Sequence, residues 1–226
     1  MKKWDEIPVF MNNEQVKYYY NILKKKERQI RIKRIFDVVM AVSLIIVLLP
    51  IMIAISVAIK MDSSGPVIFK QVRITTYGRK FHIYKFRTMV AGADKIGSKV
   101  TVQGDSRITK TGEFLRKYRL DEIPQLFNVL LGDMSFVGTR PEVEKYVHQY
   151  NDEMKATLLL PAGITSLASI KYKDEDQLLQ NAENADEEYI KVVLPEKMKY
   201  NLKALEGFNI FSDLKTMIAT VFAVVR

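Results

Sequence analysis

A chain of 226 residues has room for one good-sized domain and an appendage, but not for two full enzyme domains. The absence of cysteine excludes a disulfide framework and a thiolate nucleophile, and the presence of only two histidines argues against a zinc site. The formal net charge is +9, and much of the excess lies in residues 1–34, which hold ten Lys and Arg against four Asp and Glu. Such a block is typical of a nucleic-acid-binding surface or of a segment beside a membrane.

Residues 1–34 also carry an apolar pattern. Val16, Tyr20, Leu23 and Ile30 recur at roughly helical spacing among lysines. This spacing predicts an amphipathic helix at a membrane surface, although a short coil fits the same residues almost as well. We therefore predict that residues 1–34 form a basic interfacial segment.

An uncharged apolar segment follows from Val38 to Ile59, interrupted only by Ser43, Pro50 and Ser56. It begins too late and is too long for a secretory signal peptide. As a helix it would measure ~33 Å, which is enough to cross the hydrocarbon core of a bilayer. A single transmembrane anchor is therefore one interpretation.

The charges on both sides of this segment favour a different topology. A spanning helix would place one of two basic clusters outside the cell, against the tendency of Lys and Arg to stay inside. Pro50 lies near the middle of the segment, where it removes a backbone donor and bends the helix. We predict a re-entrant membrane helix over residues 35–60 that kinks at Leu49-Pro50 and returns to the same face. The two clusters are Lys24, Lys25, Lys26, Arg28, Arg31, Lys33 and Arg34 before the segment, and Lys60, Lys70, Arg73, Arg79 and Lys80 after it.

Two strands are predicted next, from Val67 to Ile74 and from about Lys80 to Phe86, joined by a turn around Gly78 into a β-hairpin. Alternation along the second strand places Lys85 and Arg87 on one side of it. These two cations fit a solvated strand edge and a phosphate-binding pair about equally well.

Two helices are predicted after a loop at residues 91–106. The first begins at a cap on Thr111 and runs to about residue 118, and the second spans Gln125 to Leu131 between a proline and a glycine. The acid-rich residues 173–188 are predicted to form a solvated helical face. The apolar run from Phe211 to Val225 is predicted to pack on the domain or to lie at the membrane interface.

Asp121 and Glu122 lie just ahead of the second of these helices. Backbone N–H groups at a helix start favour negative charge, which keeps Asp121 ionised and helps to hold a phosphate beside it. Taken alone, however, an Asp-Glu pair is more often plain solvated surface. The turn Gly138-Thr139-Arg140-Pro141, which presents one arginine, is an equally weak signal alone.

In chain order these motifs carry far more weight than they do singly. They are Lys33-Arg-Ile-Phe-Asp37, the apolar helix, Gly65-Pro-Val-Ile-Phe69, Tyr84-Lys-Phe-Arg-Thr-Met89, Phe114-Leu-Arg116, Leu120-Asp-Glu-Ile-Pro-Gln-Leu126, Gly132-Asp-Met-Ser135 and Gly138-Thr-Arg-Pro141. The set closely resembles the monotopic polyprenyl-phosphate phosphoglycosyl transferases, the bacterial sugar transferase family. The match covers about residues 31–170 and, more loosely, Asp213-Leu-Lys215.

The resemblance implies a two-step reaction at the membrane. The first acid of the pair, Asp121, attacks the sugar-linked phosphate of a nucleoside diphosphate sugar, usually a UDP-sugar, and UMP leaves. Polyprenyl phosphate, usually undecaprenyl phosphate, then takes the phosphosugar from the carboxylate. Glu122 is expected to assist proton transfer or metal placement, and Mg²⁺ to be bound by both acids. The implied substrate-binding residues are Lys85, Arg87, Arg116, Arg140 and Pro141.

We therefore predict an α+β fold: a mainly helical, membrane-associated protein with a small β-hairpin and an N-terminal re-entrant, proline-kinked membrane helix. The predicted units are the basic interfacial segment 1–34, the membrane helix 35–60 and a cytoplasmic catalytic domain 61–226. The expected location is the cytoplasmic (inner) membrane, with the catalytic domain on its cytoplasmic face, at the first membrane step of polysaccharide or glycoconjugate assembly, such as exopolysaccharide or capsule. The expected partners are a UDP-sugar, undecaprenyl phosphate and membrane lipids but no nucleic acid, with a homo-oligomer and pathway glycosyltransferases as further candidates.

Several positions depart from the family pattern. Leu49 stands before Pro50 where Ser is common, Thr139 stands where Pro is common, residues 160–163 lack a basic residue, and Asn201 falls where many members have an acid. Two other functions stay open: a non-catalytic membrane scaffold of a polysaccharide-assembly complex, and a membrane-tethered nucleic-acid binder. The second lacks the basic and aromatic surface pattern expected outside the N-terminus.

Overall fold

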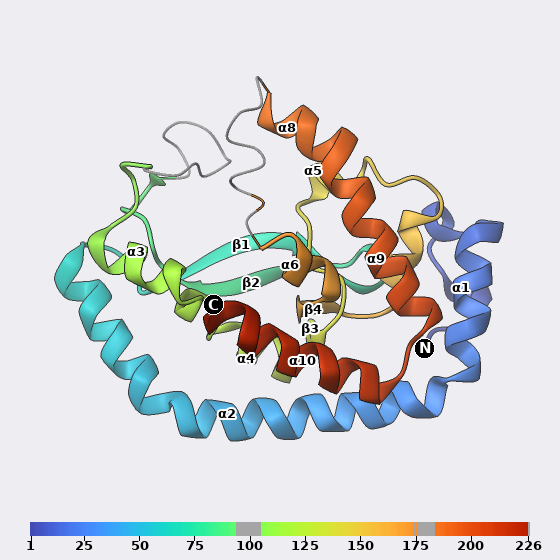
Figure 1. Cartoon of the computed structure of the whole chain (residues 1–226), viewed down its shortest axis with the longest axis horizontal. Coiled ribbons are helices and arrows are strands. Elements are labelled where there is room, and N and C mark those ends of the chain that lie inside the picture. The colour runs from blue at the N-terminus through green and yellow to red at the C-terminus, as the bar shows by residue number, and fades with distance from the viewer. Residues whose placement is uncertain (94–104, 174, 176–183, 226) are drawn as a thin grey trace.

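The computed structural model describes residues 1–93, 105–173, 175 and 184–225. These residues form an α+β protein in which helices surround two small two-stranded sheets. A long helix, α2, curves beneath the rest of the chain, and the β1–β2 hairpin lies at the centre (Figure 1). The helices are α1 (Glu14–Lys25), α2 (Glu27–Asp62), α3 (Lys110–Lys117), α4 (Gln125–Leu131), α5 (Glu144–Val147), α6 (Leu167–Lys171), α8 (Ala185–Glu188), α9 (Leu194–Glu206) and α10 (Ile210–Val225), and the strands are β1 (Ile68–Ile74), β2 (Lys80–Phe86), β3 (Met134–Val137) and β4 (Ala162–Thr165).

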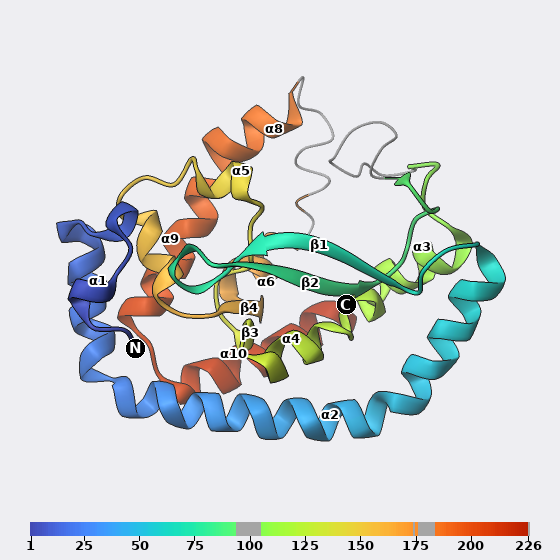
Figure 2. The ribbon, with the colours of Figure 1, turned by 180° about the vertical axis from the view of Figure 1, so that it is seen from behind.

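Helix α2 contains the predicted membrane segment. Within the described part of the chain it is the one helix that is long and apolar enough to cross a membrane, and only 17 % of its most apolar window is buried. It stays helical through Pro50 and curves around the underside of the domain (Figure 2). The sharp reversal expected at Leu49-Pro50 is thus drawn out into a continuous curved helix, and a kink at Pro50 itself stays a prediction.

Both ends of α2 are attached to the same body of protein. Near its start, Arg34 donates to the carbonyls of Val129 (2.6 Å) and Leu130 (2.9 Å) at the end of α4. At its end, the Asp62 carboxylate accepts a hydrogen bond of 2.9 Å from the backbone N–H of Thr111. One face of the helix, including Ala41 and Ile55, is buried between these points, while its other face is exposed and apolar.

The β-hairpin agrees closely with its prediction. Strands β1 and β2 pair antiparallel from Ile68 opposite Phe86 to Ile74 opposite Lys80. The connecting turn needs left-handed backbone at two residues, Tyr77 (φ 58°) and Gly78 (φ 77°). The parallel pair β3–β4, with Met134 opposite Ala162, was not predicted, because its partners are far apart in the chain.

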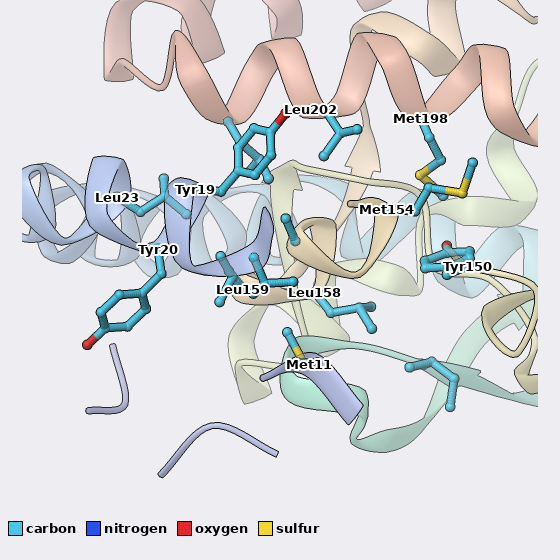
Figure 3. Packing of buried hydrophobic residues seen from close by; sticks show 14 of the residues in the cluster. Met11, Tyr19, Tyr20, Leu23, Tyr150, Met154, Leu158, Leu159, Met198 and Leu202 are labelled. Atoms are coloured by element: carbon cyan, nitrogen blue, oxygen red, sulfur yellow. The ribbon is translucent and has the colours of Figure 1, made fainter. Parts of the chain in front are cut away.

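Helix α1 confirms a helix in the N-terminal segment but not its expected contacts. Its apolar side chains Val16, Tyr20 and Leu23 are buried in the protein, in one cluster with residues of α9 and of the 3₁₀ turn Met154–Leu159. Figure 3 shows Tyr19 beside Leu202 in this cluster, with Leu23 next to Tyr19 on α1. The apolar face predicted to lie on lipid therefore packs on α9, which offers it a dry apolar surface.

The two central helices are close to their predicted bounds. α3 is capped by Thr109 rather than Thr111, because the Thr109 hydroxyl accepts from Gly112 N at 3.0 Å. α4 spans the predicted residues and ends at Gly132 in the left-handed conformation (φ 87°). The predicted loop at 91–106 and the acidic face at 173–188 lie largely outside the described residues.

The apolar C-terminal run forms α10, which lies beside α2 (Figure 1). The two helices are joined by an ion pair of 2.8 Å between Lys33 Nζ and Asp213 Oδ2. On the other face of α10, the side chains of Phe211, Val221 and Phe222 are exposed.

Candidate active site

The two predicted acids lie on a short 3₁₀ turn, Leu120–Glu122, between α3 and α4. Arg119 precedes the turn in the left-handed conformation (φ 55°), which non-glycine residues adopt rarely and which redirects the chain after α3. Pro124 follows and suits the start of α4. The turn packs against β2, so that both acids lie within 4 Å of Lys85 on that strand.

Glu122 holds two cations. Lys85 Nζ donates to Glu122 Oε1 at 2.7 Å, and Arg140 Nη2 donates to the same oxygen at 3.0 Å. Burial alone would raise the pKa of Glu122, but the charges of Lys85 and Arg140 outweigh it and hold that pKa far below its ordinary value. The Glu122 charge in turn raises the pKa of Arg140. Glu122 is therefore a permanently charged anchor for two basic side chains.

Asp121 has a different environment. It is buried, its Oδ2 lies 3.7 Å from Lys85 Nζ, and no described residue donates a hydrogen bond to its carboxylate. Burial raises the pKa of Asp121, and the charge of Lys85 opposes that rise only in part. The two neighbouring carboxyls are thus shifted in opposite directions, a pattern that marks sites with divided chemical roles.

Arg140 is positioned by the unpredicted strand pair β3–β4. Gly138 and Gly163 meet backbone to backbone, and a Cβ on Gly163 would lie only 2.2 Å from Gly138 N. Gly138 N donates to Thr165 O at 3.0 Å, and Gly163 N donates to Thr139 O at 2.8 Å. These bonds fix the turn that carries Arg140, so both glycines are needed for the close approach of the two backbones.

A buried ionic network lies behind this turn and was missed in the sequence. Arg73 Nη1 donates to the carbonyl of Pro141 at 3.1 Å and lies 3.9 Å from a Glu142 oxygen. Tyr189 donates to Glu142 at 2.5 Å, and Lys197 donates to the Tyr189 hydroxyl at 3.2 Å. No local pattern marks these residues, because they come from three separate segments of the chain: β1, the turn at Pro141-Glu142, and the continuous helical stretch from Tyr189 to Glu206.

The other two predicted cations have different positions. Arg116 on α3 donates through Nε to the Thr88 hydroxyl at 2.9 Å. Its charge acts to lower the pKa of Asp121, so Arg116 influences the pair Asp121 and Glu122, here called the dyad. The buried guanidinium of Arg87 instead donates to the carbonyls of Ser63 (2.7 Å) and Ser64 (2.5 Å), which follow the last turn of α2. These contacts give Arg87 a structural role at the end of α2, where carbonyls lack helical partners.

Within the described part of the chain, only Asp121 of the two acids has both carboxylate oxygens free to bind a metal ion. Glu122 Oε1 already accepts from two cations, whereas the Asp121 oxygens accept no hydrogen bond from the described residues. Those residues contain no group of three or more His, Cys, Asp or Glu that would hold a metal unaided. The arrangement fits Mg²⁺, which usually takes one or two carboxylates together with phosphate oxygens and waters.

A cavity of about 570 Å³ opens beside the dyad. Glu122 and Arg140 are among its lining residues, and so are Leu44 and Leu48 of α2. Its size is within the range of small-ligand sites. The cavity is therefore lined both by Glu122 and Arg140 and by residues of α2.

Comparisons with known proteins identify the family of this chain. Residues 28–226 match the family described as bacterial sugar transferase. The chain is 36 % identical over 194 residues to a UDP-glucose:undecaprenyl-phosphate glucose-1-phosphate transferase of Klebsiella pneumoniae, covering 84 % of this chain and 39 % of that protein. It is 35 % identical to a UDP-N-acetylgalactosamine-undecaprenyl-phosphate N-acetylgalactosaminephosphotransferase of Aeromonas hydrophila, covering 84 % and 43 %. A putative undecaprenyl-phosphate N-acetylgalactosaminyl 1-phosphate transferase of Bacillus subtilis is 37 % identical, over 60 % of this chain and 75 % of that protein.

The chain thus spans about two fifths of the length of the first two relatives and three quarters of the third. The family match covers Asp121 and Glu122, both strand pairs, almost all of α2 and α10, and only the first 27 residues lie outside it. This protein belongs to the bacterial sugar transferase family.

Proposed function

We propose that this protein transfers a sugar phosphate from a UDP-sugar to undecaprenyl phosphate and releases UMP. The observation that carries the proposal is the buried Asp121 carboxylate, which accepts no hydrogen bond from the described residues and lies beside the ion pairs of Glu122 with Lys85 and Arg140. A carboxylate attacks an anionic diphosphate only where nearby positive charge offsets the repulsion. Relatives named for this reaction, with UDP-glucose and UDP-N-acetylgalactosamine as donors, support it.

In the first step an Asp121 oxygen bonds to the phosphorus that carries the sugar. The bond from that phosphorus to the bridging oxygen breaks, and UMP leaves with the electron pair. In the second step a phosphate oxygen of undecaprenyl phosphate bonds to the same phosphorus, and the bond from Asp121 breaks. The product is a sugar linked to undecaprenyl diphosphate, and the carboxylate is regenerated.

Neither step needs a proton when the leaving UMP and the attacking phosphate are dianions. A role of Glu122 in proton transfer is therefore unnecessary, and its lowered pKa makes it a poor proton donor. We assign Glu122 to charge placement: it fixes Lys85 and Arg140 where negative charge develops on the transferred phosphoryl group. Bound Mg²⁺ would neutralise charge on the diphosphate, with Asp121 and the phosphate oxygens as its nearest oxygen ligands.

We also propose that the protein enters the membrane from the cytoplasmic face without crossing it. At ~1.5 Å per residue, the 36 residues of α2 would span about 54 Å, yet both of its ends are bonded to the same domain. A helix that crossed the bilayer would leave its ends on opposite sides. The exposed apolar face of α2 then lies in lipid while its inner face supports the site.

The test is UMP release from a panel of UDP-sugars by the protein in membranes containing undecaprenyl phosphate and Mg²⁺. Wild-type protein should release UMP with at least one donor, and Asp121→Asn should abolish both UMP release and the covalent phosphosugar adduct. Asp133→Asn, a carboxylate paired with Arg79 away from the dyad, is the matched control and should retain most activity. Full activity of Asp121→Asn would overturn Asp121 as the nucleophile, whereas no UMP release by wild-type protein from any donor would support the non-catalytic scaffold.

A further inference from the structure

We propose that the cavity beside the dyad is the acceptor subsite, a proposal that rests on the function proposed above. Its basic rim would hold the phosphate of the polyprenyl acceptor, and its apolar wall would hold the first isoprene units. The donor nucleotide would bind elsewhere around the dyad. Three observations carry this assignment: the two-sided lining of the cavity, the pairing of the nearby cations, and the continuity of the cavity with the membrane helix.

The lining of the cavity contains an apolar set of side chains, here called the wall, and a basic set, here called the rim, together with polar side chains such as Thr165, Ser169 and Thr220. Its aliphatic and aromatic side chains include Leu48 of α2, Leu126 of α4, Phe136 of β3, Ile164 of β4 and Ile170 of α6. Such a wall contacts a hydrocarbon chain favourably, whereas the hydroxyls of a nucleoside or a sugar would lose their hydrogen bonds to water there. The chemistry of the lining matches a phosphate ester of a long apolar alcohol.

The cations around the cavity fall into two groups. Arg140 and Lys197 are paired with carboxylates, at 3.0 Å to Glu122 and 2.7 Å to Glu175. In contrast, three cations on the rim form no ion pair with any described residue: Lys117, Arg119 and Lys173. Cations without protein carboxylates converging on one cavity favour an anionic ligand.

Arg119 connects these rim cations to the dyad. It lies directly before the 3₁₀ turn of the acids, and its left-handed backbone is a strained conformation of the kind found at functional sites. Its guanidinium donates to the carbonyl of Lys173 at 3.3 Å, which joins the segment after α6 to the dyad turn. A phosphate held between Arg119 and Lys173 would lie close to Glu122 and to the adjoining Asp121.

The apolar wall is continuous with the lipid-facing part of α2. Leu44 and Leu48 are half-buried in the cavity wall, and the neighbouring Ile46, Val47 and Leu49 are exposed on the outer surface of the same helix. A polyprenyl chain could therefore pass from bilayer to cavity along one helix without crossing water. A water-soluble nucleotide would reach the site from the aqueous phase and would not need such a path.

Substitutions that remove one positive charge from the rim test the assignment. In nanodiscs, Arg119→Gln and Lys173→Gln should each raise the KM for undecaprenyl phosphate on the order of tenfold, the weight of about one charge-assisted hydrogen bond. The KM for the UDP-sugar and the stoichiometric UMP burst without acceptor should change by less than twofold. Lys171→Gln, a matched loss of charge two residues away and outside the cavity lining, should change neither constant.

A binding measurement separates this proposal from the activity itself. A photoreactive polyprenyl phosphate should crosslink to peptides that contain Ile164 or Ala223, and Ala223→Trp should suppress the crosslink because Ala223 lines the cavity. Phe222→Trp, on the exposed side of α10 and outside the lining, is the matched control and should leave it intact. Undecaprenyl phosphate should compete with the probe, whereas inorganic phosphate, phosphatidylglycerol and UDP-sugar should not.

The opposite results would overturn the acceptor subsite. A rise in donor KM in the rim variants with acceptor KM unchanged would assign the cavity to the nucleotide. Equal competition by phosphatidylglycerol would make it a general anionic-lipid site. If wild-type protein released no UMP from any UDP-sugar yet crosslinked as expected, the proposed function would fail while the lipid-phosphate subsite stood.

Discussion

Substituting the two acids of the dyad separately should move protein stability in opposite directions. Glu122→Gln keeps the shape of the side chain but replaces two hydrogen bonds between charged partners, from Lys85 and Arg140, with bonds from the same cations to a neutral amide oxygen. Loss of the carboxylate charge weakens each of these bonds by about 1 kcal/mol. The Arg140 side chain is 34 % exposed, so solvent screening limits any larger penalty. We expect a loss of about 2 kcal/mol in the free energy of unfolding.

Asp121→Asn should instead stabilise the fold. The charged Asp121 carboxylate is buried without a hydrogen bond from the described residues, and burial raises its pKa, so the folded state favours the neutral form. A neutral amide of the same shape removes that unfavourable charge, for a gain of about 0.5–2 kcal/mol. The gain should be present at pH 7 and vanish below pH 3.8, the ordinary pKa of Asp, because both the folded and unfolded states are then protonated.

The assay is thermal unfolding of both variants in the same detergent, followed by intrinsic fluorescence. For a chain of this size 1 kcal/mol moves Tm by about 2–4 °C, so Glu122→Gln should lower Tm by roughly 4–8 °C and Asp121→Asn should raise it. Both variants should lose transferase activity, and Asp121→Asn should lose it completely. A lower Tm for Asp121→Asn, or an unchanged Tm for Glu122→Gln, would refute the division between an unsatisfied nucleophile and a structural anchor.

Three further results are expected. Gly163→Ala should destabilise the protein by about 1–3 kcal/mol and impair turnover, because its Cβ would lie 2.2 Å from Gly138 N; thermal unfolding and UMP release measure both effects. Arg34→Ala should cost about 1–2 kcal/mol in an unfolding assay, since two carbonyls at the end of α4 lose their donor, whereas Arg31→Ala, at an exposed position, should cost less than 0.5 kcal/mol. The pH profile of kcat/KM should fall on the acid side through a pKa above 3.8, because burial raises the pKa of Asp121 and its protonated form is not a nucleophile.

Local patterns predicted the elements whose signals lie close together in the chain. The hairpin and α4 follow from period-two alternation and from a proline and a glycine at the helix ends, and the structure confirms both within one residue. The contact of Lys85 and Arg140 with the two acids was expected only through the family resemblance. Lys85 lies 36 residues before Asp121, and Arg140 lies 18 residues after Glu122. Distance along the chain hides such contacts from local reasoning.

Other features could not be predicted because one residue type serves several purposes. Lys33 and Arg34 were counted with the basic cluster expected at the lipid surface, yet Lys33 is buried in an ion pair and Arg34 bonds to the end of α4. Arg87 likewise bonds to carbonyls at the end of α2 rather than reaching the dyad. The sequence does not show whether a lysine or arginine binds a phosphate, a carboxylate or the carbonyls at a helix end.

The burial of one face of α2 in the protein has a consequence for how such enzymes can be prepared and recombined. Ala41 packs with Phe81 and Val129 in one hydrophobic cluster, and Ile59 packs with Leu115 in another. The helix is therefore not a tether that can be cut away to leave a water-soluble fragment, because its removal would open the interior of the remaining chain. An exchange of this segment between family members would have to carry the matching interior residues with it. Purification calls for an amphiphile that covers the outer face of the helix and leaves its inner face packed.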